Sequence, residues 1–307
     1  MAEFSGKSGG SILPTSASAP QPQLTPTEQL MYSTVRLVNE SGGLTRSGTG
    51  FFFQLFKSQE SSVPVIVTNR HVVDGWDKCA FSFAGRLADG SPDLDHHIPI
   101  QLDNFGTAWI PHPDVDLVVI PIGAALAELA RVGIPPYFIA LDPSLILTEG
   151  ELESLTPVEQ ILTVGFPGQI WDDVHNTPLF HRGYTSTAPY IDFRGNKEFL
   201  IDIATWPGAS GSPVLLYNDN GWMDRHGNTV LGGIRAKLLG VVYGVAVEDV
   251  TGNIVLQNAP TQIAASAAMR VPTNLGACIK ATRILEFEPL LASKGVKRPA
   301  GYIMRAK

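Results

Sequence analysis

The sequence predicts an all-β protein built from two antiparallel six-stranded β-barrels and a C-terminal helix. Three observations support this prediction. Short apolar runs rich in Val, Ile, Phe and Tyr follow one another closely and are separated by turn residues, a pattern typical of sandwiches and barrels. A helical pattern is rare, and no internal repeat of fixed period occurs. The runs are also too numerous for a single small barrel.

Each predicted strand corresponds to one apolar run, and thirteen runs are found. In chain order they are STVRLVN, GTGFFFQLF, PVIVTN, KCAFSFA, HIPIQL, TAWIPH, DLVVIPI, QILTVGF, FLIDIA, SPVLLY, LLGVVYGVAV, NIVLQ and LGACIKA. Helix formers at the right period predict helices over 123–132 and 281–292, with Pro289 weakening the end of the second.

The chain divides into three parts. Residues 1–26 are rich in Ser, Gly, Pro and Gln and are expected to form a disordered arm. Residues 27–293 form the folded domain, with one barrel over 27–135 and the other over 136–280, followed by the helix. Residues 294–307 hold five basic side chains and are interpreted as a solvated tail.

Bulk composition excludes several function classes. The 307 residues carry a formal net charge of −7, which argues against a nucleic-acid binder. No apolar window is long enough to span a bilayer, and the first ten residues show no signal-peptide pattern. The two cysteines, Cys79 and Cys278, lie in apolar contexts and are expected to be free thiols. A soluble, cytoplasmic protein of a reducing compartment is therefore expected.

The stretch WPGASGSPVL, residues 206–215, contains a candidate nucleophile. Ser210 lies between two glycines in a tight turn, immediately before an apolar run. One interpretation is a plain turn, because Gly, Ser and Pro favour turns for their own reasons. The other is a nucleophilic serine, which needs a sharply bent backbone whose N–H groups converge on one point. A nucleophile also requires a base and an orienting acid.

His71 is the candidate base. It lies in VIVTNRHVVDG, where an apolar strand ends and passes a histidine to a short turn. A rigid strand end can hold an imidazole as a general base requires. The alternative is a histidine that only caps the strand.

Asp116 is the candidate acid because it opens the apolar run 117–122. A carboxylate at the mouth of a buried strand needs a hydrogen-bond donor, and the Nδ1–H group of a histidine is a good one. Asp114 competes with it, since residues two apart in an extended chain point to the same side. Asp116 is preferred because it adjoins the apolar run and is expected to be more buried.

The order His71, Asp116, Ser210 is the order found in chymotrypsin-type enzymes, whereas other folds use other orders. The chain here resembles the trypsin-like serine peptidases of the chymotrypsin fold, and among them the HtrA/DegP-like and glutamyl-endopeptidase-like bacterial branches. The resemblance rests on GTGFFF…VIVTNRHVV, DVDLVVI, DIATWPGASGSPVL, GVVYG and LGACIKA, and it covers about residues 32–290.

The resemblance implies roles for individual residues. Ser210 would be the nucleophile, His71 the general base and Asp116 the group that holds the imidazole tautomer. The backbone N–H groups of Gly208 and Ser210 would form the oxyanion hole. No cofactor and no metal is implied, and the histidines show no metal-ligand spacing.

The sequence departs from the family in three ways. No Ile-Val-Gly-Gly-like N-terminus is present, and no PDZ-like region follows the last helix. Val242 stands where the glutamyl branch has a histidine in its primary pocket, which argues against acidic specificity.

The substrate is expected to be a polypeptide. The segments that wall the primary pocket in this family carry no acidic residue here, which predicts a preference for small or medium apolar side chains. The backbone of the late strand would pair with an extended substrate. The expected substrate-binding residues are Thr205, Trp206, Val242, Tyr243, Gly244 and Val245.

Two rival functions remain open at this stage. One is an inactive protease-fold scaffold, although no triad member is missing. The other is an esterase or acyl-transfer enzyme, although α/β-hydrolases place the acid after the serine. The stretch 165–175 is expected to be a surface loop near the cleft, and Trp171 and Trp206 are candidates to line that cleft. The sequence does not predict an oligomeric state.

Overall fold

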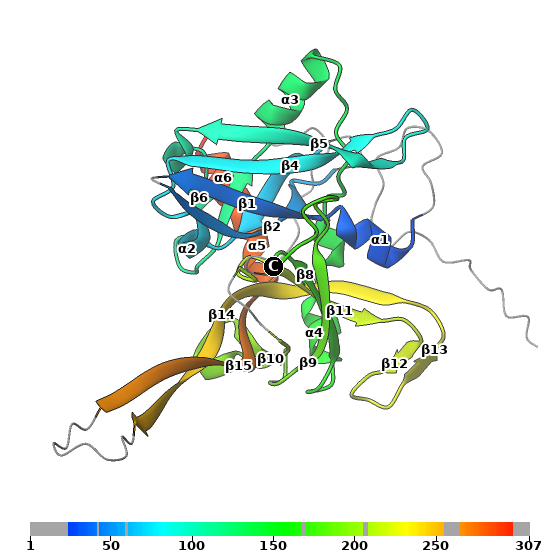
Figure 1. Cartoon of the computed structure of the whole chain (residues 1–307). Coiled ribbons are helices and arrows are strands. Elements are labelled where there is room, and N and C mark those ends of the chain that lie inside the picture. The colour runs from blue at the N-terminus through cyan, green and yellow to red at the C-terminus, as the bar shows by residue number, and fades with distance from the viewer. Residues whose placement is uncertain are drawn as a thin grey trace, which may run out of the picture.

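Two β units lie one above the other in the protein (Figure 1). The computed structural model describes residues 24–41, 43–58, 61–167, 170–204, 208–254 and 265–296. The first unit is a seven-stranded sheet with the order β5-β4-β1-β2-β3-β7-β6, and the second is a closed barrel with the order β10-β15-β14-β11-β8-β9. All pairings between these named strands are antiparallel.

The strands of the first unit come from the N-terminal part of the chain. They are β1 Thr34–Ser41, β2 Leu44–Leu55, β3 Val63–Thr68, β4 Lys78–Arg86, β5 Pro92–Asp103, β6 Ile110–Pro111 and β7 Val118–Pro121. The barrel follows with β8 Gln160–Gly165, β9 Leu179–Thr185, β10 Glu198–Asp202, β11 Pro213–Asn218, β14 Arg235–Ile254 and β15 Ala265–Lys280. A separate hairpin pairs β12 Gly221–Met223 with β13 Thr229–Leu231.

Helices are few among the described residues. They are α1 Pro26–Met31, α2 Arg70–Val73, α3 Gly123–Arg131, α4 Glu149–Glu153, α5 Thr282–Leu285 and α6 Phe287–Ser293. The predicted helix over 123–132 is confirmed by α3. None of the described helices is long and apolar enough to cross a membrane.

The predicted helix over 281–292 is present, but Pro289 does not weaken its end. The helix divides at Glu286, and Pro289 lies in the first turn of α6. A proline is tolerated there because the N–H group that it lacks would have no partner within the helix.

The predicted six-stranded second barrel is confirmed, whereas the first unit differs from the prediction. It is a sheet of seven strands, with β5 and β6 at its two edges. Strand β6 is only two residues long, and its second residue, Pro111, has no N–H group to donate to another strand. Pairing therefore stops at β6.

Three strands were not predicted, namely β9, β12 and β13. In β9 the burial alternates between half-buried and exposed residues, so its apolar signal is weak. The predicted run NIVLQ is not a separate strand, because its first two residues end β14 and its remainder lies outside the described residues. The predicted arm lies outside them up to residue 23, and the basic tail from residue 297.

The central strands of the first unit are buried on both faces. In β2, Phe51 and Phe53 belong to the cluster that faces the barrel, while Phe52 belongs to the cluster on the opposite face of the sheet. In β3, Val67 and Ile66 divide in the same way. Successive side chains of a strand point to opposite faces. Two buried faces therefore account for the continuous apolar runs FFF and VIV.

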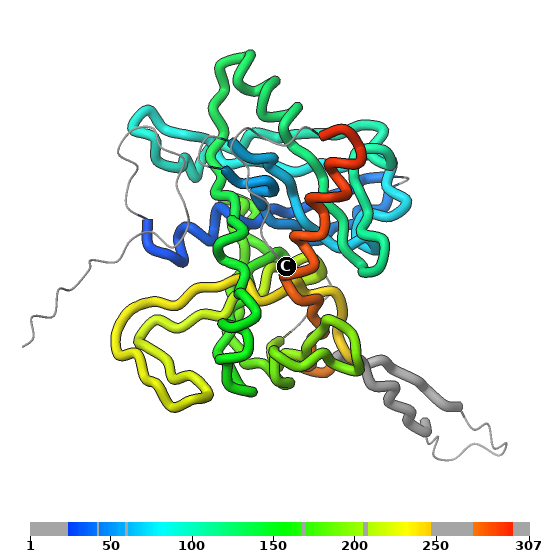
Figure 2. Tube along the Cα trace, turned by 180° about the vertical axis from the view of Figure 1, so that it is seen from behind, coloured from blue at the N-terminus to red at the C-terminus, as the bar shows by residue number. Residues whose placement is uncertain are grey.

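A shared core joins the two units. The cluster that holds Phe51 and Val67 also contains Leu162, Leu215 and Val241 of the barrel. The C-terminal helices contribute Ile284, Phe287 and Leu291 to the same cluster. The C-terminal segment (red in Figure 2) runs from the barrel across the first unit. The two units are thus packed rigidly against each other by buried apolar side chains.

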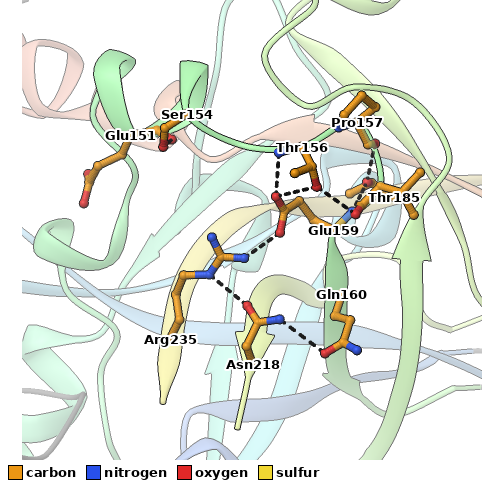
Figure 3. Close-up of polar contacts among 10 residues, drawn as sticks. Glu151, Ser154, Thr156, Pro157, Glu159, Gln160, Thr185, Asn218 and Arg235 are labelled. Carbon is orange, nitrogen blue, oxygen red and sulfur yellow. Dashed lines mark hydrogen bonds and ion pairs between the residues drawn. The ribbon is translucent and has the colours of Figure 1, made fainter. Parts of the chain in front are cut away.

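A buried ion pair ties together strands of the barrel (Figure 3). Arg235 of β14 contacts Glu159 through Nη2 at 2.5 Å, and the two side chains are only 12% and 4% exposed. The Nε–H group of Arg235 donates to Asn218 of β11, whose amide donates to Gln160 of β8. The other carboxylate oxygen of Glu159 accepts from the backbone and hydroxyl of Thr156.

We predict that Arg235→Met destabilises the protein by about 3–5 kcal/mol, because it leaves the buried carboxylate of Glu159 without its cation. The additional change Glu159→Gln removes that charge and should recover part of the loss. Urea unfolding of both variants measures the effect.

A matched control is Arg182→Met, since Arg182 pairs with Asp219 at 2.7 Å but both side chains are substantially exposed. That variant should unfold at the wild-type urea concentration. Equal unfolding midpoints for Arg235→Met and Arg182→Met would contradict a stabilising role of the buried pair.

Candidate active site

His71 and Asp116 are in direct contact. Strand β3 ends at Thr68, and the single turn of α2 places His71 two residues after Asn69. The carboxylate of Asp116 lies 2.5 Å from Nδ1 of His71 through Oδ2, and its Oδ1 accepts the backbone N–H group of His71 at 3.0 Å. The two contacts fix both the position and the ring orientation of the imidazole.

The two candidate acids separate clearly in the structure. The Asp116 side chain is 30% exposed, whereas that of Asp114 is 69% exposed and pairs with Arg283 at 3.3 Å. The carbonyl of Asp116 also accepts the buried amide of Asn69 at 2.8 Å. The loop of Asp116 and the turn of His71 are therefore tied to each other, and of the two candidate acids it is Asp116 that contacts His71.

Ser210 lies in a tight turn that is fastened to β14. The N–H group of Gly211 donates to the Val242 carbonyl at 2.8 Å, and the Val242 N–H group donates to the Ser212 carbonyl at 3.0 Å. Gly208 and Gly211, on the two sides of the serine, have φ values of 94° and 88°. Side chains rarely tolerate this backbone region, so glycine is needed at both positions.

Thr49 of β2 connects the serine turn to the first unit. Its N–H group donates to the Ser210 carbonyl at 3.1 Å, and its hydroxyl donates to the Gly208 carbonyl at 3.0 Å. The same hydroxyl accepts the N–H group of Phe166 at 2.9 Å. Thr68, three residues before His71, donates its hydroxyl to the Thr49 carbonyl at 2.7 Å. The link from the serine turn to the histidine turn is thus continuous.

Sequence reasoning did not single out Thr49 and Thr68, although both lie inside quoted motifs. Each is a polar residue within an apolar run, GTGFFF or VIVTN, and this position could have indicated a structural role. A fully buried hydroxyl needs hydrogen-bond partners, and both threonines are fully buried. Close packing reinforces the link. A Cβ atom at Gly211 would overlap the Thr49 carbonyl.

Among the described residues, no hydrogen bond joins Ser210 to His71. The Ser210 turn is instead placed beside the end of β3 through Thr49 and Thr68. Catalytic hydrogen bonds are often long in a free enzyme and shorten when substrate binds. The His71 side chain is 48% exposed, which leaves its ring accessible.

A pocket adjoins the serine turn inside the barrel. Its walls include Ala209 and Ser212, on either side of Ser210, and Val242 of β14. The full lining is Thr163, Gly165, Pro167, His181, Ile203, Ala204, Ala209, Ser212 and Val242. Two polar lining residues were not singled out from the sequence. His181 lies on β9, which was not predicted, and Thr163 lies in the middle of the apolar run QILTVGF.

Burial lowers the pKa of His181 below its ordinary value. Burial disfavours the charged imidazolium, so the neutral ring persists to a lower pH than for a histidine in water. The lining residues contain no carboxylate and no permanently charged cation. The pocket is therefore small, mostly apolar and uncharged near neutral pH.

Within the described part of the chain, the expected substrate strand is unpaired along one edge beyond Val242. Pairing of β11 with β14 ends at Val241, and contacts of the serine turn end at Val242. On its other side β14 remains paired to β15, with bulges around Tyr243 and Ala246. The Tyr243 hydroxyl donates to Glu198 at 2.9 Å, which draws this side chain toward β10. Gly244 and Val245 follow along the same edge.

The remaining candidates have varied environments. Thr205 and Trp206 lie outside the described residues. The guanidinium of Arg36 lies over the ring of Trp171, with its Cζ atom 3.7 Å from the ring centroid. The Asp172 carboxylate lies 2.8 Å from Nδ1 of His175 and accepts two backbone N–H groups of its own loop, so it closes a turn.

Both cysteines are free and buried, as predicted. Burial raises the pKa of Cys79 to about 12 and that of Cys278 well above its usual range. Thiols that stay protonated are poor nucleophiles. Within the described part of the chain, no three His, Cys, Asp or Glu side chains gather as a metal site would need.

Comparisons with solved structures give distant similarities. Rv3671c from M. tuberculosis H37Rv, in an inactive mutant form, is 16% identical over 93% of this chain and 100% of its own, with a TM-score of 0.42. The tobacco etch virus protease with bound product is 14% identical over 87% and 79%, with a TM-score of 0.43. A serine protease of a human pathogenic astrovirus is 12% identical over 80% and 88%, with a TM-score of 0.36.

No curated protein matches the chain. A family profile does: residues 48–221 match the trypsin-like peptidase domain. This span covers more than half of the 307 residues and contains His71, Asp116 and Ser210. The chain therefore belongs to the trypsin-like peptidase domain family.

Proposed function

We propose that this protein is a serine endopeptidase that uses Ser210, His71 and Asp116. The contact of Asp116 with both the ring and the backbone N–H group of His71 carries the proposal. An aspartate that meets the Nδ1 of an exposed histidine directs the other ring nitrogen, Nε2, outward as a base. The hydrogen-bonded link through Thr49 brings the serine turn toward that base.

The proposed reaction proceeds in two halves. Nε2 of His71 takes the Ser210 hydroxyl proton as the serine oxygen attacks the substrate carbonyl, and the same proton then passes to the leaving amine. Asp116 stabilises the imidazolium that forms between these steps. The backbone N–H groups of Gly208 and Ser210 bind the developing oxyanion. Water, deprotonated by His71, then attacks the acyl carbon; the ester bond to Ser210 breaks, and His71 returns the proton to the serine oxygen.

The substrate binds as an added strand in this proposal. Among the residues that the structure describes, the edge of β14 from Tyr243 to Val245 has no strand partner on the side of the serine turn, and this stretch begins where the turn leaves the strand. Backbone N–H and carbonyl groups along such an edge pair with an extended peptide of almost any sequence. The scissile bond of that peptide would then lie over Ser210.

Preference for a small or medium apolar side chain before the scissile bond follows from the pocket beside the serine turn. Ala204, Ala209 and Val242 form apolar walls, and the neutral ring of His181 adds no charge. A charged substrate side chain would lose its hydration there without gaining an ion pair. We further propose the HtrA-like or glutamyl-endopeptidase-like branch, on the motif resemblance of residues 202–213.

We predict that a fluorophosphonate probe labels the wild-type protein and that Ser210→Ala abolishes labelling. Only a serine activated by a neighbouring base reacts rapidly with such a probe. Intact-mass spectrometry measures the adduct, and Ser91→Ala, at a serine whose hydroxyl donates to Asp89 in an exposed hydrogen bond, serves as the control that retains labelling.

A folded wild-type protein that takes up no probe would contradict the proposal. The protease-fold scaffold would then become the better interpretation. Labelling that survives in Ser210→Ala would assign the nucleophile to another residue. Hydrolysis of esters without cleavage of any peptide in a library would favour the esterase.

The pH dependence of substrate preference tests the pocket. We predict that the ratio of kcat/KM for a substrate with Leu before the scissile bond to one with Glu falls as pH decreases from about 8 to about 5. The lowered pKa of His181 keeps its ring neutral over the upper part of this range. Protonation of the ring, once the pH falls below this lowered pKa, then disfavours Leu and favours Glu.

The ratio is used because a pH effect on the catalytic step itself affects both substrates equally. In His181→Leu the ratio should stay constant over the whole pH range. A wild-type ratio that is independent of pH would show that His181 does not face the bound side chain.

A further inference from the structure

His112 lies in the segment that carries the catalytic acid. This segment connects β6 to β7, and it closes on itself because the His112 N–H group donates to the Leu117 carbonyl at 2.9 Å. The His112 ring bridges the inside of the loop, where Nδ1 accepts the N–H groups of Asp114 at 3.1 Å and Val115 at 3.4 Å. Asp116 is the next residue, so the ring sets the shape of the turn that presents it.

The His112 ring is held in one tautomer and one orientation. Its side chain has no exposed surface. A nitrogen that accepts two N–H groups carries no proton, which leaves the proton of the neutral ring on Nε2. Nε2 lies 3.3 Å from Oε2 of Glu286, and the ring packs edge-to-face on Phe287 with centroids 5.3 Å apart. Both of these partners belong to the C-terminal helical segment.

Arg283 closes the cluster around His112. Its guanidinium contacts Asp114 at 3.3 Å and Glu286 at 2.9 Å. Asp114, Arg283 and Glu286 are the charged groups that face His112. Burial and the nearby Arg283 lower the pKa of His112, which agrees with a neutral ring. Glu288 adds a second tie between α6 and the first unit, since it accepts the Phe56 N–H group at 2.7 Å.

These contacts connect the C-terminal helices to the loop that carries Asp116. The helices follow β15 of the barrel, yet their side chains hold the loop of Asp116 in the first unit. A loop that lost the bridging ring would let Asp116 move relative to His71. Misplacement of a catalytic group by about 1 Å can lower a rate by on the order of 100-fold.

We propose that His112 is a positioning residue: its Nδ1 closes the turn that aims the Asp116 carboxylate at His71, its ring lies against Glu286 and Phe287, and Arg283 ties the same loop through Asp114. The expected effect of His112 on the rate rests on the proposed function, whereas its effect on the His71–Asp116 contact does not require turnover. His112 touches no reacting atom.

The test compares His112→Leu with His112→Asn. Leucine fills the space but accepts no hydrogen bond. Asparagine can accept the N–H group two residues later through its side-chain oxygen, as in an Asx turn. The control is His96→Leu, which removes an exposed histidine paired with Asp93 on β5. Circular dichroism and thermal unfolding establish that each variant is folded.

Two readouts are measured on each variant. The first is the rate of fluorophosphonate labelling at Ser210, expected to fall on the order of 100-fold in His112→Leu and to recover largely in His112→Asn. The second is the downfield proton NMR signal of the His71–Asp116 hydrogen bond, assigned by its loss in Asp116→Asn. That signal should weaken or shift in His112→Leu and persist in His112→Asn and His96→Leu.

A folded His112→Leu protein with the wild-type signal and labelling rate would overturn the inference. If His112→Leu does not fold, Glu286→Gln and Arg283→Met replace it, and the inference fails if both leave signal and rate unchanged. A third outcome separates the two proposals. If the NMR signal is lost in His112→Leu but the wild-type protein takes up no probe, the positioning role is supported and the proposed function is contradicted.

Discussion

The proposed site depends most on the hydrogen bonds of Thr49, because its nucleophile and its base belong to different β units. Ser210 lies on the barrel, and His71 and Asp116 lie on the first sheet. Thr49 binds the Ser210 and Gly208 carbonyls from the first sheet, and Thr68 binds Thr49 in turn. Both hydroxyls are buried, so water does not compete for these bonds and they hold the serine turn firmly.

Burial elsewhere keeps this junction rigid. The sheet between the two apolar clusters cannot move without disturbing close-packed side chains on both of its faces. The C-terminal helices complete the cluster on the barrel side and also reach the loop of Asp116 through Glu286 and Arg283. The serine turn of the barrel is thus held by Thr49 of the first sheet. The loop of Asp116 in the first sheet is held by Glu286 and Arg283, which follow the barrel in the chain.

The sequence predicted most strands, the closed barrel and the contact partners His71 and Asp116, because these follow from local pattern and motif order. It could not predict that Asp114 turns to Arg283, since residue 283 is 169 positions away in the chain. It missed β9, whose outward residues are exposed and whose alternation is weakly apolar. It therefore also missed His181 in the pocket. Thr49, Thr68 and His112 were inconspicuous because their importance arises from burial and long-range partners.

The rate of Ser210 acylation in Asp116→Asn is the sharpest test of whether the His71–Asp116 contact activates the serine. An asparagine of the same shape can occupy the site, but its amide group favours the wrong tautomer of His71 as a base. We expect a folded variant whose acylation rate at neutral pH is lower by about 10⁴-fold. An unchanged rate in the folded variant would show that the His71–Asp116 contact does not activate Ser210, and the proposed triad would be wrong.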